Sequence, residues 1–494
     1  MKTVLWLFFC VLAGLYIAGP IADPDLWWHI VAGRWIITNS EIPYRDYWNM
    51  FGISMPWRAY SWSNEILFAF IDQQWGIEGL LVLQCLFALL ISLTFAYVFG
   101  KLSNDNFFGG LLGFYSTIAT FNHFSLRPQS LTWIFFAWLI YVADQIKREG
   151  INSKRLLCLS IIIILWANTH LTTLLGIGSV LLWIYDSKKV KEQGVKYIWH
   201  VALVLVGSLF ITPYLGGEIF ALFSHASHPF AYSSISEFQP AQINSYSTVF
   251  LIILLAVFLL FLHKVPKIIP LSQLVLLVGF TIAALAVIKF LPLAIIIISA
   301  LLASIWRVHG DKKSASLGEL GISFSKLKKL YFSTLEGQGL AVLLLAAIFI
   351  QVVRIQKNPI SLDQTPKEAL DYIMDHKLSG PILNLFGDGG YVMYRFSDES
   401  GNPSLLVPID GRTNVNSPEI MRMHSAALRG QLNWKEYLDA VKPNTILWRV
   451  ESPLTALLLE SPDWCLVHKD GSQEKGHVVF SKKIDSSQRC PITS

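Results

Sequence analysis

Long apolar runs recur along this chain and constrain its fold more than any other feature. Most have roughly 16–22 residues, and a helix rising ~1.5 Å per residue needs about that length to cross ~30 Å of hydrocarbon. Hydrophobic residues make up 53% of the sequence and charged residues 15%, unlike a soluble domain. We therefore predict an α-helical polytopic membrane protein with about eleven spans, at residues 3–21, 78–100, 106–122, 130–146, 155–168, 171–186, 198–214, 247–263, 270–288, 292–307 and 337–354.

Lysine and arginine are distributed unevenly between the two sides of these spans. With the N-terminus inside, eighteen lie at inner ends and loops and five on the outer side of the membrane part. The positive-inside rule then predicts a bacterial inner-membrane protein with a cytoplasmic N-terminus. We expect a transmembrane domain over 1–356 and a periplasmic domain over 357–494. The net charge of +5 is scattered and forms no single patch, so no nucleic-acid partner is indicated.

The outer loop over residues 22–63 is too long and too aromatic to be only a connector. It opens with Asp23 and Asp25, directly after the first span. Apolar and polar positions over residues 26–39 predict a helix lying in the membrane interface. Such a helix would hold both carboxylates at headgroup depth, where chemistry on a lipid-linked substrate can occur.

Other polar residues fall at the predicted outer ends of helices. They include Arg127, Asn168, His170, Glu237 and Lys289. Polar and ionisable groups near hydrocarbon are costly, so they usually face a polar cavity or the interface. Because all of these lie on the predicted outer side, we expect an aqueous active-site cavity there.

Several motifs of this chain occur together in one known group of proteins. The first loop reads Asp23-x-Asp25-x-Trp27-Trp28-His29-x-x-x-Gly33-Arg34-x-Ile36, then Ile42-Pro43-x-x-Asp46, Pro56-Trp57 and Trp62-x-x-Glu65. Further matches are Leu126-Arg127-Pro128-Gln129, Trp166-Ala167-Asn168-x-His170, Ser236-Glu237-Phe238, Gly389-Gly390-Tyr391 and Asp410-Gly411-Arg412. Over nearly its whole length the chain resembles bacterial membrane proteins similar to the GT-C glycosyltransferase superfamily, polytopic enzymes that use polyprenyl-phosphate sugars.

The resemblance implies an inverting sugar transfer on the outer face, from a polyprenyl-phosphate donor within the membrane lipid to a glycan, lipid or protein acceptor. Asp23 or Asp25 is the implied base, since a carboxylate can take the proton of the attacking hydroxyl. The leaving lipid phosphate needs a positive charge or a divalent cation. Candidate cations are Arg127, Lys289 and Arg34. The other expected substrate-binding residues are His29, Asp46, Trp57, Glu65, Asn168, His170 and Glu237.

Each of these residues also has a structural interpretation. Asp23 and Asp25 are good helix caps, and the pair could instead bind a divalent cation. The tryptophans resemble an interfacial aromatic belt, and Arg127 and Lys289 could simply extend to the interface. The histidines lack the spacing of a zinc site, so none is expected.

The tail alternates short apolar strands with helices, which predicts an α/β domain. Helices are expected over 369–375 and 434–441, and strands over 381–386, 405–409, 445–450, 465–468 and 477–480. Gly387 to Gly390 predicts a tight turn from strand to helix. Cys465 and Cys490 lie in a polar region and could form a disulfide.

Two other classes of protein fit parts of the pattern. A transporter would place ionisable residues or broken helices near the bilayer midplane, where this sequence has only isolated Asn, Gln and Thr. A non-catalytic envelope assembly protein would need neither Asp23 nor Asp25, and its tail would carry the function. Glycosyl transfer is the interpretation we prefer.

Overall fold

The chain folds into two compact units and passes between them several times. The computed structural model describes residues 2–194, 196–217, 219, 235–264, 269–309, 346, 349–351, 353, 357–470, 475–483 and 490. The helical unit comprises Met1–Gly19, Leu81–Gly216 and Ser236–Lys357. The mixed unit comprises Pro20–Leu80, Gly217–Ile235 and Asn358–Ser494.

Each expected span except the last coincides with a helix. The helices of the helical unit are α1 (Lys2–Ile17), α4 (Asn106–Ala119), α5 (Pro128–Glu149), α6 (Ser153–Ala167), α7 (Thr173–Tyr185), α8 (Lys188–Gln193), α9 (Lys196–Leu209), α12 (Tyr246–Lys264), α13 (Leu271–Ala286) and α14 (Leu291–His309). The later part of α3 (Trp62–Ser103) also belongs to this unit. Gly76 kinks α3, with φ 59° and ψ −148°.

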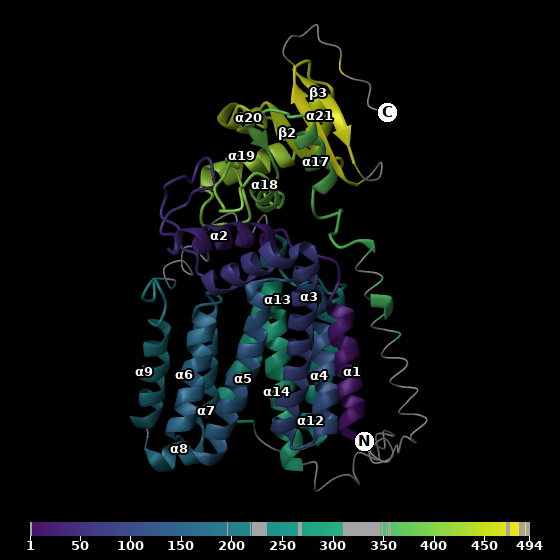
Figure 1. Cartoon of the computed structure of the whole chain (residues 1–494). Helices are drawn as coiled ribbons and strands as arrows, with labels where there is room; N and C mark the ends of the chain where they lie inside the picture. Colours follow the sequence, from purple (N-terminus) through teal and green to yellow (C-terminus); the bar gives the residue numbers. More distant parts are fainter. Residues whose placement is uncertain are drawn as a thin grey trace. The chain divides into compact units, whose positions relative to one another are not determined.

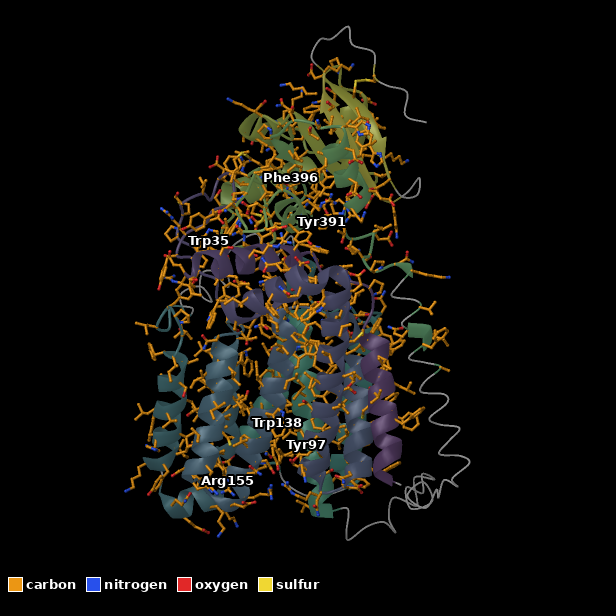
Figure 2. The ribbon with its side chains drawn as sticks, in the orientation of Figure 1. Trp35, Tyr97, Trp138, Arg155, Tyr391 and Phe396 are labelled. Atoms are coloured by element: carbon orange, nitrogen blue, oxygen red, sulfur yellow. A yellow bond between two sulfur atoms is a disulfide. The ribbon has the colours of Figure 1, made fainter. Side chains whose placement is uncertain are left out.

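The long helices of this unit pack side by side (Figure 1). Helix α14 packs against α4, α5, α12 and α13, and its residues 291–303 are all buried. Aromatic contacts join neighbouring helices, as between Tyr97 of α3 and Trp138 of α5, whose ring centroids lie 5.4 Å apart (Figure 2). The apolar sequence of α14 therefore forms the core of the bundle.

The helical unit has the length and surface of a membrane-embedded bundle. Among the described residues, three helices are long and apolar enough to cross a membrane, namely Trp62–Ser103, Tyr246–His263 and Ile288–Val308. Large apolar side chains such as Leu203, Leu259 and Ile282 point outward, as lipid-facing residues do. The chain is a multi-pass membrane protein. The number eleven stays a prediction, since most of the last expected span, 337–354, lies outside the described residues.

The mixed unit contains a four-stranded sheet flanked by short helices. Its strands are β1 (Ile382–Leu383), β2 (Thr445–Arg449), β3 (Trp464–Lys469) and β4 (His477–Lys482), in the order β1-β2-β4-β3. Strands β1 and β2 are parallel, and the other two pairings are antiparallel. Its helices are α2 (Asp25–Asn39), α17 (Lys367–Asp375), α18 (Gly389–Arg395), α19 (Pro418–Leu428), α20 (Lys435–Val441) and α21 (Pro453–Leu459), with the first part of α3.

The tail has the predicted α/β character, with three differences. The strand expected over 405–409 is wrong, because this stretch makes only one isolated bridge, between Val407 and Asn49 of the first loop. Helices α19 and α21 were not predicted. Both begin with proline after serine, a helix-start signal that was overlooked. Their apolar residues, including Ile420 and Leu454, complete the core over the sheet.

Helix α2 forms where the first loop predicted a helix, but its surroundings differ from those expected. Residues 26–33 are all buried, and polar His29 is as inaccessible as apolar Leu26. The prediction that this helix lies in the membrane interface, with one apolar and one polar face, is therefore wrong for this segment. Helix α18 of the tail covers one side of α2, and the aromatic rings of Trp27 and Tyr391 lie 4.8 Å apart.

Candidate functional site

The acid pair, Asp23 and Asp25, lies at the first turn of α2. Asp23 is 6% exposed, and its Oδ1 accepts the backbone N–H of Asp25 at 2.9 Å. Asp25 is more accessible, and its Oδ1 accepts the indole N–H of Trp28 at 3.1 Å. Pro24 is the N-cap of α2 and no side chain caps it, so Asp23 instead bonds the first residue of the helix, while Trp28 fixes the orientation of the Asp25 carboxylate.

Two glycines of the tail approach the acid pair closely. A Cβ atom at Gly411 would lie 2.1 Å from Oδ1 of Asp25, and one at Gly390 would lie 2.6 Å from the carbonyl oxygen of Pro24. Both distances are far below van der Waals contact. A side chain at Gly390 would meet backbone, and one at Gly411 would push the Asp25 carboxylate aside. The tail thus forms part of the surroundings of Asp25.

Behind Trp28 lies a buried pair from α2 and α3. The Nδ1 atom of His29 is 3.1 Å from Oε1 of Glu65, and both residues are buried. The rings of Trp28 and His29 are in contact, with centroids 3.6 Å apart and their planes tilted by 32°. The structure therefore brings together Asp25, His29 and Glu65, three of the predicted site residues, through the ring of Trp28.

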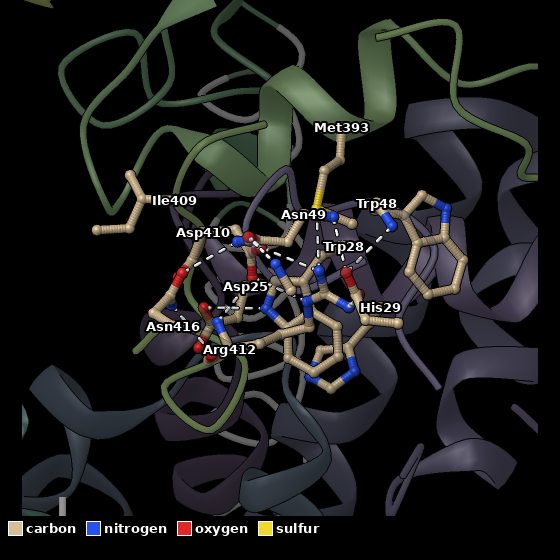
Figure 3. A network of polar contacts seen from close by, with 12 residues as sticks. Asp25, Trp28, His29, Trp48, Asn49, Met393, Ile409, Asp410, Arg412 and Asn416 are labelled. Carbon is tan, nitrogen blue, oxygen red and sulfur yellow. Dashed lines mark hydrogen bonds and ion pairs between the residues drawn. The ribbon is translucent and has the colours of Figure 1, made fainter. Parts of the chain in front are cut away.

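A second polar network joins the first loop to the tail around Arg412 (Figure 3). The Arg412 guanidinium donates from Nε to Asp410 Oδ1 at 2.8 Å, from Nη2 to Asp410 Oδ2 at 2.9 Å, and from Nη1 to Asp46 Oδ1. Asn49 donates to Asp410 Oδ2 at 3.2 Å. Burial alone would lower the pKa of Arg412, but Asp410 and Asp46 raise it above its usual value. The guanidinium therefore stays charged inside the protein.

The network gives Asp46 and Trp57 structural roles. Asp46 is 0% exposed, and its Oδ2 accepts the backbone N–H of Asn49 at 2.8 Å. The Trp57 ring is buried, with its centroid 4.9 Å from the Arg412 guanidinium carbon. Both side chains are buried within the network, and the ligand-binding role expected for them stays a prediction.

Arg34 is also held within the mixed unit. Its Nη2 atom lies 2.6 Å from Asp72 Oδ2, and its guanidinium stands 4.8 Å from the ring centroid of Tyr394. The hydroxyl of Tyr394 donates to the same carboxylate at 3.1 Å. This cluster ties α2, α3 and α18 together, and Arg34 is thereby oriented by two partners.

In the helical unit, three predicted residues from separate segments meet. Arg127 precedes α5, Glu237 lies in the short helix Ser236–Phe238, and Lys289 in the short helix Ile288–Phe290. Arg127 is ion-paired to Glu237, and Lys289 Nζ lies 3.1 Å from Glu237 Oε2. Burial would raise the pKa of Glu237, but the two cations hold it well below its usual range. Within the described part of the chain, Arg127 and Lys289 therefore share this carboxylate.

Asn168 and His170 lie in the turn between α6 and α7. The Asn168 amide donates to the carbonyl oxygens of Ile164 and Ile211 at 2.8 and 2.9 Å. The Nδ1 atom of His170 lies 3.0 Å from the Thr172 hydroxyl. These bonds close the end of α6, which is a structural use of both side chains.

The donor set for a divalent cation is small. Among the described residues, no group of three or more His, Cys, Asp and Glu side chains could hold a metal ion. Mg²⁺ is commonly held by one or two carboxylates with water and substrate phosphate. One oxygen each of Asp23 and Asp25 already accepts a hydrogen bond. Asp23 and Asp25 are the two carboxylates that would hold such a cation.

Comparison with known proteins gives a likeness of fold. No family model and no curated protein matches the chain. The structure of the archaeal oligosaccharyltransferase AglB from Archaeoglobus fulgidus, in complex with an inhibitory peptide and a dolichol-phosphate, matches with a TM-score of 0.55 and 10% identity, over 91% of this chain and 69% of that one. The apo form of the Archaeoglobus fulgidus oligosaccharyltransferase matches with a TM-score of 0.52 and 9% identity, over 91% and 70%. The chain therefore has the fold of these GT-C enzymes, and the resemblance seen in its motifs is confirmed for the fold.

Proposed function

We propose that this protein is a membrane glycosyltransferase that moves a sugar from a polyprenyl-phosphate donor to an envelope acceptor. The acid pair at the start of α2, within a fold shared with oligosaccharyltransferases, is the observation that carries the proposal. The AglB structure was determined with a dolichol-phosphate and a peptide, so a lipid-linked donor suits this fold.

Asp25 is the proposed base. It is the more accessible of the two carboxylates, and Trp28 holds one of its oxygens. The acceptor hydroxyl oxygen attacks the anomeric carbon while its proton passes to Asp25. The bond from the anomeric carbon to the phosphate oxygen breaks, and its electron pair leaves with the lipid phosphate. A divalent cation held by Asp23 and Asp25 would neutralise charge on that phosphate.

A separate part of the proposal concerns the helical unit. Arg127 and Lys289 both contact Glu237, and arginine and lysine side chains commonly bind phosphate, so this pair of cations suits a phosphate. Binding of a polyprenyl phosphate to Arg127→Gln, measured beside the wild type, tests this part alone. Equal affinity of the two proteins would reject it.

We further propose that residues 357–494 lie outside the cytoplasm, as the distribution of lysine and arginine suggests. The bond between Cys465 and Cys490 supports this topology. Disulfides persist in oxidising compartments and are rare in the cytosol.

The test is sugar turnover by the full-length protein in lipid, with polyprenyl-phosphate hexose and pentose donors. Asp25→Asn should lower turnover at least ~100-fold, because general-base catalysis contributes about 10²–10⁴-fold. Asp23→Asn should cost less, since an Asn oxygen can still accept the backbone N–H of Asp25. Asp375→Asn, on the exposed side of α17, is the matched control. Wild-type turnover by Asp25→Asn would remove Asp25 as the base. Absence of turnover with every donor would favour the non-catalytic assembly protein.

A further inference from the structure

The mixed unit contains a cavity that none of the groups discussed so far explains. Its volume is about 330 Å³. It lies between the turn after β1, helix α19 and the end of β2. Its lining includes Leu385, Phe386, Asp388, His424, Arg429 and Arg449. Ligand pockets span ~300–1,000 Å³, so this one suits a ligand of about one sugar ring.

The charged groups around the cavity are mostly positive. Arg429 follows α19 with an exposed side chain. Arg449 Nη2 and His477 Nε2 lie 3.8 and 3.6 Å from the same oxygen of Asp388. Burial would lower the pKa of His477, but Asp388 and Asp470 raise it to about 9, so this imidazole is cationic at neutral pH. Three cations against Asp388 and Asp470 leave one positive charge in excess.

Two buried polar atoms of the wall lack a hydrogen-bond partner within the described part of the chain. They are Oδ2 of Asp388 and Nδ1 of His424. Burial lowers the pKa of His424 to about 4, so its ring is neutral and can bond a hydroxyl. A buried polar atom without a partner destabilises the folded protein. A ligand with several hydroxyls offers such atoms the partners they lack.

The remaining wall is apolar. Leu385 and Met421 are buried, while Phe386 is partly exposed beside them. The carbon-bound hydrogens of a sugar ring form an apolar face that can pack on such side chains. The cavity therefore combines an apolar wall, hydroxyl-bonding atoms and an excess cation.

We propose that this cavity binds an acidic sugar unit of the acceptor glycan, with its carboxylate on Arg429 and its hydroxyls on Asp388 and His424. The inference rests on the proposed glycosyl transfer, because that activity calls for a glycan acceptor. In this proposal the cavity binds one sugar unit of the acceptor glycan, and a different unit of the same glycan receives the transferred sugar.

Glucuronic acid and neutral glucose are the probes, and their binding to the full-length protein in nanodiscs is measured by titration calorimetry. Glucuronic acid should bind at least about tenfold more tightly than glucose, because a charge-assisted bond to arginine is lost with the neutral sugar. Arg429→Gln should remove this preference. Arg422→Gln is the matched control, since Arg422 is an exposed residue of the same helix that pairs with Glu436 outside the cavity.

Equal binding of the two sugars, no binding of either, or unchanged preference in Arg429→Gln would overturn the proposal. Donor turnover in the same preparations separates it from the proposed function. Turnover without glucuronic acid binding rejects the cavity alone. Binding without turnover for any donor rejects the sugar transfer and leaves an acidic-sugar site.

Discussion

His477 is a buried imidazole held between two carboxylates. Its Nε2 lies 3.6 Å from Asp388 Oδ1 and its Nδ1 lies 3.7 Å from Asp470 Oδ1, while the side chain is 0% exposed. A group whose pKa is higher in the folded than in the unfolded protein stabilises the fold. This contribution is fully present below the pKa of the unfolded state, and it is lost as the pH rises through the pKa of the folded state.

We therefore expect the thermal stability of the protein to fall between about pH 6.5 and pH 9. A pKa difference of about 2.5 corresponds to roughly 3 kcal/mol at ~1.36 kcal/mol per unit. His477→Asn should be less stable at pH 6.5 and nearly insensitive to pH over this window. Melting curves followed by tryptophan fluorescence measure this, with exposed His376→Gln as the control. A similar slope in His477→Asn would show that another group is responsible.

Individual residues also show what the sequence could reveal about the site. Arg127, Glu237 and Lys289 could be chosen because each is an ionisable residue beside an apolar run, and the structure pairs them. The partner of Asp46 could not be found in this way. Arg412 lies 366 positions away, and a buried ion pair leaves no local sequence pattern.

At the scale of elements, α2 is positioned by the tail more than by its own sequence. Trp48 of the first loop donates its indole N–H to the carbonyl oxygen of Gly401 at 2.8 Å. The backbone N–H of Val407 donates a hydrogen bond to the carbonyl oxygen of Trp48. Periodicity predicted the existence of α2, because that depends on local spacing. It could not predict which surface covers the helix, because a buried face and a lipid face have the same composition.

Gly411→Ala should lower sugar turnover at least about tenfold. The added Cβ displaces the Asp25 carboxylate, and misplacement by ~1 Å can cost about 10²-fold in rate. Turnover of the full-length protein is the measurement. Gly178→Ala in α7 is the control, because a Cβ there meets no atom within 4 Å. Normal turnover in Gly411→Ala would show that the position of Asp25 does not limit the reaction.

For the whole molecule, hydropathy predicted the helical part well. Ten of its expected spans coincide with helices. The grouping of the first loop with the tail was beyond the sequence, because it depends on contacts between segments about 350 residues apart.

Topology can be tested through the bond between Cys465 and Cys490. In a variant with the free cysteines Cys10, Cys85 and Cys158 replaced by alanine, a membrane-impermeant maleimide should label intact spheroplasts only after an impermeant reductant is added. Labelling that also needs permeabilised membranes would place the tail in the cytoplasm. Labelling without reductant would show that the thiols are free.

The contacts between α2 and the glycines of the tail also determine when, during synthesis of the chain, the acid pair can reach its native position. On the ribosome, Asp23 and Asp25 are made before Gly390, Gly401 and Gly411, which pack against α2 and come more than 350 residues later. Until then Trp27 and Trp28 have no native cover, so the nascent protein carries an uncovered apolar helix throughout synthesis of its membrane part. A chain interrupted before Gly411 carries both carboxylates without the backbone that packs against them.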